Sequence, residues 1–77
     1  MRKNGNFTIL SCFTFPELEF EVVLAKNDSF NSWVTWIYNK RYDSYFWGHY
    51  FNEYKKALND YTERVTEEVR IYNLEHN

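Results

Sequence analysis

The side chains that could act as nucleophiles in this chain are few and lie far from any base in the sequence. Cys12 needs an adjacent base to become a thiolate, and His49 on a neighbouring strand is the candidate. Ser11 has the same requirement. We expect Cys12 to be a small buried side chain within a strand. We interpret His49 as a structural residue that ties the end of a strand to the helix after it.

Glu19 and Glu21 stand two residues apart, so a strand would present both carboxylates on one face. Paired carboxylates can perform acid–base catalysis when a pocket separates their pKa values. The apolar residues that alternate with them predict instead a half-buried strand whose carboxylate face is wet. We therefore expect a solvated pair of carboxylates at this place.

Cofactor and metal sites have no support in the sequence. Gly5 and Gly48 are the only glycines, and two scattered glycines cannot build a phosphate-binding loop. Cys12, His49 and His76 are too far apart to supply metal ligands at the usual spacing. We expect no catalytic residues, no metal and no cofactor, and hence a protein that is not an enzyme.

Composition narrows the class of protein further. The 77 residues are 22% aromatic and 26% charged, which excludes a disordered tail and predicts one small domain. The basic start of the chain is followed by no secretory signal pattern, and no run reaches the roughly 18 apolar residues of a membrane span. We therefore expect a cytoplasmic protein that does not contact membranes.

The hydrophobic pattern predicts an α+β domain over residues 1–77. Period-two alternation indicates strands, and a period of 3.6 after residue 51 indicates a helix. The expected fold is a four-stranded antiparallel β-meander with one long C-terminal helix packed on one face (ββββα). The predicted strands cover residues 6–15, 18–25, 33–39 and 45–51, and the predicted helix covers residues 52–74.

Strict alternation also predicts which face each side chain occupies. It places Phe7 and Phe13 on one face of the first predicted strand, and Tyr45 and His49 on one face of the fourth. Gly48 lies among large aromatic residues, which predicts a β-bulge or a close neighbour at this position.

Aromatic side chains concentrate between residues 30 and 54, where eleven of them occur. One helix covers only one face of a sheet, so the other face or the edges must meet solvent or a partner. Trp, Tyr and Arg are the residues most enriched at binding hot spots. The pattern favours a protein-binding protein with these candidate contact residues: Trp33, Trp36, Tyr38, Arg41, Tyr42, Tyr45 and Trp47.

Two other functions stay open. An aromatic sheet face with Lys40 and Arg41 at a hairpin tip could bind single-stranded nucleic acid by stacking. Nine basic against eleven acidic residues, a net charge of −2, disfavour direct nucleic-acid binding, because few phosphates could be neutralised. A homodimer formed through the uncovered sheet face is compatible with either function.

Residues 48–64 carry a pattern that consists of Gly48, Tyr50, Phe51, Ala57, Asp60, Tyr61 and Arg64. This pattern resembles one in small uncharacterised phage and prophage proteins of Gram-positive bacteria. The resemblance implies a phage or mobile-element protein that binds and inhibits a host protein. Anti-CRISPR proteins, which block a CRISPR effector nuclease by stoichiometric binding, are one such class. If inhibition used DNA mimicry, the candidate acidic residues are Glu19, Glu21, Asp60, Glu63, Glu67 and Glu68.

Overall fold

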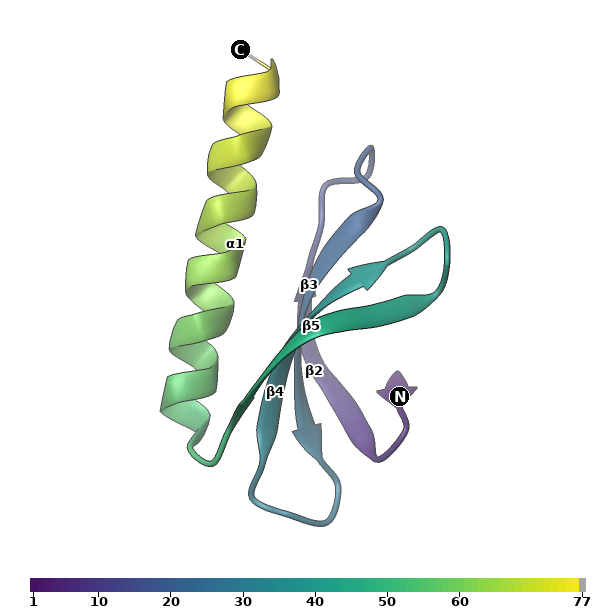
Figure 1. Cartoon of the computed structure of the whole chain (residues 1–77), viewed down its shortest axis with the longest axis vertical. Coiled ribbons are helices and arrows are strands. Elements are labelled where there is room, and N and C mark those ends of the chain that lie inside the picture. Colours follow the sequence, from purple (N-terminus) through teal and green to yellow (C-terminus); the bar gives the residue numbers. More distant parts are fainter. Residues whose placement is uncertain (77) are drawn as a thin grey trace.

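One long helix lies across one face of a strongly curled antiparallel sheet (Figure 1), in a computed structural model that describes residues 1–76. The sheet contains five strands in the order of the sequence, each antiparallel to the next. The elements are β1 (Lys3–Asn4), β2 (Phe7–Phe13), β3 (Phe20–Asn27), β4 (Trp33–Asn39), β5 (Ser44–Phe51) and α1 (Tyr54–His76).

The predicted α+β class, with an antiparallel sheet and one C-terminal helix, is confirmed. The prediction of four strands is wrong, because β1 adds a fifth strand at the edge. A two-residue strand is too short to show alternation, so the hydrophobic pattern could not reveal β1. The first long strand ends at Phe13 rather than at residue 15, and α1 begins at Tyr54 rather than at residue 52.

The face of the sheet away from α1 is closed by the curl of the sheet itself. Its core consists of Val23, Ala25, Val34 and Trp36, which are buried. The ring of Phe7 packs edge-on against Trp36, with 5.2 Å between centroids. The prediction that this face of the second long strand is wet is therefore wrong for the residues of β3, because β2 and β5 wrap around the face on which we expected solvent.

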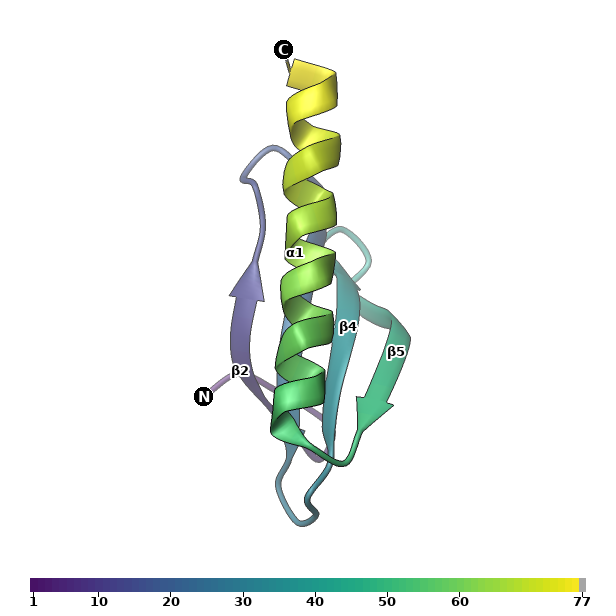
Figure 2. The ribbon, with the colours of Figure 1, turned by 90° about the vertical axis from the view of Figure 1, so that its left-hand side faces the viewer.

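The opposite face of the sheet packs against α1, which runs along β3 and β4 (Figure 2). Val22, Leu24 and Thr35 are fully or almost fully buried there. The helix contributes Ala57, its one buried residue in the part of the chain that the structure describes. A side chain of one methyl group lets the start of the helix approach the sheet closely.

A β-bulge in β2 changes the face of the residues that follow it. Ile9 pairs with Ala25, but Ser11 pairs with Leu24, so one extra residue lies in β2. A one-residue shift moves every later side chain to the other face. Phe7 therefore faces away from α1 and Phe13 faces α1, and the prediction that they share a face is wrong.

A second bulge lies in β5, as the position of Gly48 predicts. Thr35 pairs with His49 and Ile37 pairs with Phe46, which leaves one extra residue in β5. Tyr45 and His49 consequently lie on opposite faces, and the prediction that they share a face is wrong. The close neighbour at Gly48 is confirmed too, because a Cβ there would lie 3.0 Å from Trp36 Nε1.

Candidate functional site

A polar cluster joins α1 to the sheet beside the β5 bulge. The Thr35 hydroxyl donates a hydrogen bond to Asp60, and His49 Nδ1 lies 3.0 Å from Asp60 Oδ2. Arg64 Nε lies 3.5 Å from the same carboxylate oxygen, and Arg64 Nη2 donates to the Trp47 carbonyl at 2.7 Å. The interpretation of His49 as a tie between strand and helix agrees with these contacts.

Burial alone would raise the pKa of Asp60. The hydrogen bonds from Thr35 and His49, with the positive charge of Arg64, outweigh burial and hold this pKa below its usual value. Thr35 is fully buried, and its hydroxyl donates to the carboxylate rather than to the imidazole. The cluster therefore lacks the order of nucleophile, base and orienting carboxylate that covalent catalysis needs.

Four residues of the sequence pattern over residues 48–64 lie at this junction between the sheet and α1. Gly48 permits the close approach of Trp36, Ala57 permits the approach of the helix, and Asp60 and Arg64 belong to the polar cluster. Each of these positions has a structural reason to hold its residue type.

A cleft of about 620 Å³ opens between the sheet and the middle of α1. The sheet curls away from the helix at this end, as the divergence of β5 from α1 in Figure 1 shows. The lining residues come from three strands and the helix. They are Phe20, Ile37, Phe46, Trp47 and His49 from the strands, and Arg64, Glu67 and Glu68 from the helix.

Trp47 stands at this cleft with an unusual backbone. Its φ is +52°, and 74% of the residue is exposed. A left-handed conformation costs a residue with a side chain about 1–2 kcal/mol, and such strain is concentrated at functional sites. Neighbours hold the conformation, because the Trp47 carbonyl accepts a hydrogen bond from Arg64 and the indole packs edge-on against Phe46.

The helix side of the cleft is acidic. Glu67 pairs with Arg70, whose Nε donates to Glu67 Oε2 at 3.1 Å. Within residues 1–76, Glu68 makes neither an ion pair nor a side-chain hydrogen bond. Burial raises the pKa of Glu68, and the negative charges of Glu67 and Glu75 raise it further. Glu68 is therefore a carboxylate that a cation from outside would stabilise.

The structure places the predicted contact residues in four different regions. Trp47 lines the cleft, while Arg41 and Tyr42 are exposed at the β4–β5 hairpin tip. Trp33 is half-buried, with its ring 6.1 Å from that of Tyr54. Trp36 is only 6% exposed, which leaves it almost no surface to offer a partner. The face away from α1 holds the remaining three: Trp36, Tyr38 and Tyr45.

The predicted acidic residues do not share one surface. Glu19 is exposed and pairs with Arg41, whereas Glu21 is buried and pairs with Arg2. Asp60 lies in the polar cluster, and Glu63 is exposed on α1. The cleft is lined by the last two of the set: Glu67 and Glu68. The cleft thus brings together one predicted aromatic residue and two predicted carboxylates.

Sequence reasoning missed the strand residues that line the cleft. Phe20, Ile37 and Phe46 have the alternation of core residues, and their sequence does not show that the helix leaves them uncovered. The signal that could have located the site is Gly48, because the bulge it permits carries Trp47.

The prediction that Cys12 is buried is wrong. β1 pairs only with Phe7 and Thr8, so the edge of β2 has no neighbouring strand at Cys12, which is exposed.

The described residues contain no group of three or more His, Cys, Asp or Glu side chains that could hold a metal. Across residues 1–76, no helix has both the length and the hydropathy needed to cross a bilayer.

Comparisons with protein-family models, with curated proteins and with solved structures give no match to this chain.

Proposed function

We propose that this chain is a non-enzymatic protein that binds a partner protein through the cleft between β5 and α1. The exposed Trp47, held at positive φ beside an apolar cleft, carries the proposal. Trp is the residue type most enriched at binding hot spots, and a rigid indole next to a concave apolar surface is the usual form of such an anchor. Among the described residues, no contact within the chain requires this indole to be exposed.

The chemistry of the cleft limits the partner. Phe20, Ile37 and Phe46 favour an apolar side chain of the partner at the strand side. Glu68 favours a Lys or Arg at the helix side, because a cation there would offset the repulsion from Glu67. The expected ligand is a protein segment that presents a large apolar side chain next to a basic one.

The resemblance to phage and prophage proteins supports a narrower form of the proposal. A phage protein with these properties would bind a host protein in the infected cell and inhibit it by covering a functional surface. A CRISPR effector nuclease is the specific candidate. The surfaces with which such a nuclease binds nucleic acid are rich in Lys and Arg, so they could supply the cation that Glu68 favours. Inhibition would then be stoichiometric, with a steric block at the cleft.

Affinity capture from a nuclease-treated host lysate tests the proposal, with three baits compared by mass spectrometry. The baits are the wild type, Trp47→Gly, and the double variant Arg41→Glu/Tyr42→Ala. The proposal predicts a stoichiometric protein that the wild type and the hairpin-tip variant capture and that Trp47→Gly loses. The Gly substitution suits the positive φ, so loss of capture would report the missing indole rather than misfolding.

Three other outcomes would contradict the proposal. A partner lost only in Arg41→Glu/Tyr42→Ala would move the binding site to the hairpin tip. Capture of nuclease-sensitive material alone would favour the single-stranded nucleic-acid alternative, and a captured second copy of the chain would favour a homodimer. The narrower form is tested by titrating the wild type and Trp47→Gly into DNA-cleavage reactions of CRISPR effector nucleases. It predicts inhibition that saturates at one equivalent of wild type.

A further inference from the structure

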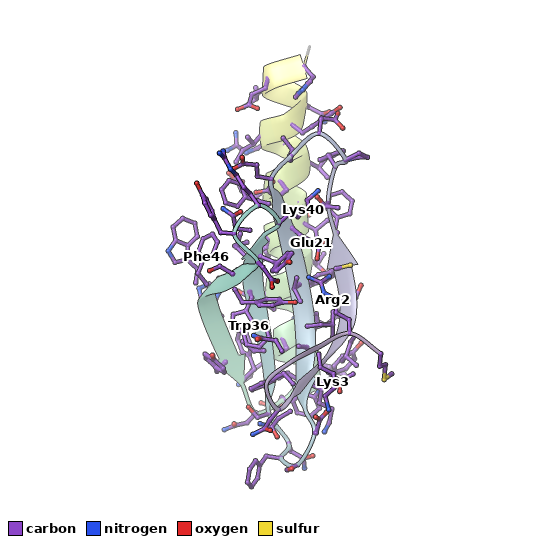
Figure 3. The ribbon with its side chains drawn as sticks, turned by 90° about the vertical axis from the view of Figure 1, so that its right-hand side faces the viewer. Arg2, Lys3, Glu21, Trp36, Lys40 and Phe46 are labelled. Carbon is purple, nitrogen blue, oxygen red and sulfur yellow. The ribbon has the colours of Figure 1, made fainter. Side chains whose placement is uncertain are left out.

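Glu21 presents a buried carboxylate on the face of the sheet away from the cleft. Its side chain is 10% exposed, and burying a charge without a partner is strongly unfavourable. The partner is Arg2, which forms an ion pair with Glu21 through Nη1. Figure 3 shows the two residues on this face, with Arg2 arriving from the segment before β1 and Glu21 projecting from β3.

The surroundings of the Arg2 guanidinium form a cage with several distinct contacts. Arg2 Nε donates a hydrogen bond to Tyr45 Oη at 3.1 Å. The guanidinium carbon lies 4.7 Å from the centroid of the Tyr38 ring and 5.6 Å from that of Tyr45. A planar cation with donors at fixed angles matches one carboxylate, one phenol oxygen and two ring faces, whereas a compact ammonium does not.

The residues of the cage and the cation within it come from different parts of the fold. Glu21, Tyr38 and Tyr45 pair with one another across β3, β4 and β5, so the cage belongs to the body of the sheet. Arg2 precedes the two-residue strand β1, and its side chain is 37% exposed. Its backbone is held by one hydrogen bond, from Ile9 N to Arg2 O at 2.9 Å, before the short pairing of β1 begins.

We infer that Glu21, Tyr38 and Tyr45 form a guanidinium-binding site, which Arg2 fills within the chain and which an arginine of another protein can fill when Arg2 leaves. The segment that carries Arg2 then acts as an internal competitor for that arginine. The site lies on the face of the sheet opposite the cleft, so it does not depend on the function proposed above.

Rescue of a chain that lacks the Arg2 guanidinium tests this inference. Arg2→Ala is titrated with Nα-acetyl-arginine-N-methylamide, which presents an arginine as a protein does, and the Tm is followed by circular dichroism. A ligand that binds only the folded state should raise the Tm of Arg2→Ala saturably, by about 6–11 °C at ten times its Kd. The wild type, whose site is filled, should show no saturable rise over the same range.

Two controls make the result specific. Nα-acetyl-lysine-N-methylamide has the same charge and backbone but an ammonium head, and it should give at most a small rise. The double variant Arg2→Ala/Glu21→Gln lacks the carboxylate and should not respond to the arginine probe. If Arg2→Ala does not fold, Arg2→Gln keeps an amide donor for Glu21 and replaces it in the titration.

Three results would overturn the inference. One is the absence of a saturable rise in both Arg2 variants, and another is an equal rise with the lysine probe. The third is an undiminished response in Arg2→Ala/Glu21→Gln. Each would reduce the Arg2–Glu21 pair to an ordinary ion pair within the chain.

Discussion

The two faces of the sheet differ in what covers them and in how completely they are closed. The face away from α1 is closed by the sheet's own curl, around Val23, Val34 and Trp36, with one ion pair at its rim. The face toward α1 is held by a polar cluster near Asp60 and then opens into the cleft. The curl that closes one face therefore draws part of the sheet away from a straight helix on the other.

The curl of the sheet also explains where the cleft and the exposed Trp47 lie. A straight helix cannot follow a curled sheet across its whole width, so contact is close at Ala57, whereas the side of the helix toward β5 opens into the cleft beside Arg64. Farther along, Tyr72 still stacks on Phe15. The bulge in β5 then places Trp47 at the mouth of the resulting gap. Four sets of variants test the contrast between the closed face and the open one.

Trp36→Ala should have the largest effect, because it removes the centre of the closed face. We expect the free energy of unfolding to fall by about 3–5 kcal/mol, as for other buried aromatic residues. The matched control is Trp47→Ala on the open side, which removes the same side chain and should cost less than about 1 kcal/mol. Urea unfolding at pH 7 measures both. Equal losses would show that the core does not lie on the face away from α1.

Asp60→Asn should have the second-largest effect on the free energy of unfolding, because it removes the charge that holds α1 to the sheet. We expect a loss of about 2–3 kcal/mol at pH 7, below the roughly 3–5 kcal/mol for a fully buried pair, because the Asp60 side chain is partly exposed. The pKa of Asp60 is lower in the folded state than in the unfolded state, so its stabilisation is present above the unfolded pKa, about 3.9, and is lost as the pH falls through the folded pKa. The gap between wild type and variant should therefore narrow in urea melts at pH 3. A gap that is constant between pH 7 and pH 3 would contradict the role of this charge.

Gly48→Ala should destabilise the chain by about 1–3 kcal/mol, because the added Cβ overpacks the closed face through the bulge. That atom would lie 2.9 Å from Tyr50 Cε1 and 3.1 Å from Trp36 Cδ1. Gly5→Ala is the matched control, since its Cβ meets nothing within 4 Å and only its φ of +56° disfavours alanine. Chemical denaturation of both variants separates overpacking from backbone strain. A smaller loss for Gly48→Ala than for Gly5→Ala would argue against close packing at the bulge.

The difference in stability between Trp47→Gly and Trp47→Ala should be the smallest of these effects. It measures the backbone strain at Trp47 on the open face. Both remove the indole, but only glycine adopts a φ of +52° without cost. We expect the Gly variant to be more stable than the Ala variant by about 1 kcal/mol, and both to lose partner capture. Thermal unfolding monitored by circular dichroism provides the comparison. An Ala variant as stable as the Gly variant would mean that the positive φ relaxes when the indole is gone.

Much of the fold could be predicted because the spacing of hydrophobic residues is a local property of the chain. The stripe of apolar residues spaced three and four apart located α1, and alternation located β3 and β4 within a few residues. The face assignments failed at Phe13 and His49 because each follows a bulge, and a single extra residue inverts every later face. Gly48 indicated the bulge in β5, whereas no residue near Leu10 indicated the bulge in β2.

The candidate site was predicted less completely, since its parts come from distant positions. Trp47, Glu67 and Glu68 were singled out for two unrelated reasons, aromatic enrichment and acidity. Glu21 was assigned to solvent because its strand alternates, and the segment carrying Arg2 lies nineteen positions away from it.

The class of the fold, the order of its long elements and the bulge at Gly48 can be inferred from residue patterns along the chain. These follow from side-chain periodicity and backbone freedom, which act over a few neighbouring residues. The curl, the cleft beside Trp47 and the pairing of Arg2 with Glu21 arise only when the chain is folded. Their physical origin is the coiling of five paired strands against a straight helix, and that geometry depends on contacts between residues that no local pattern relates.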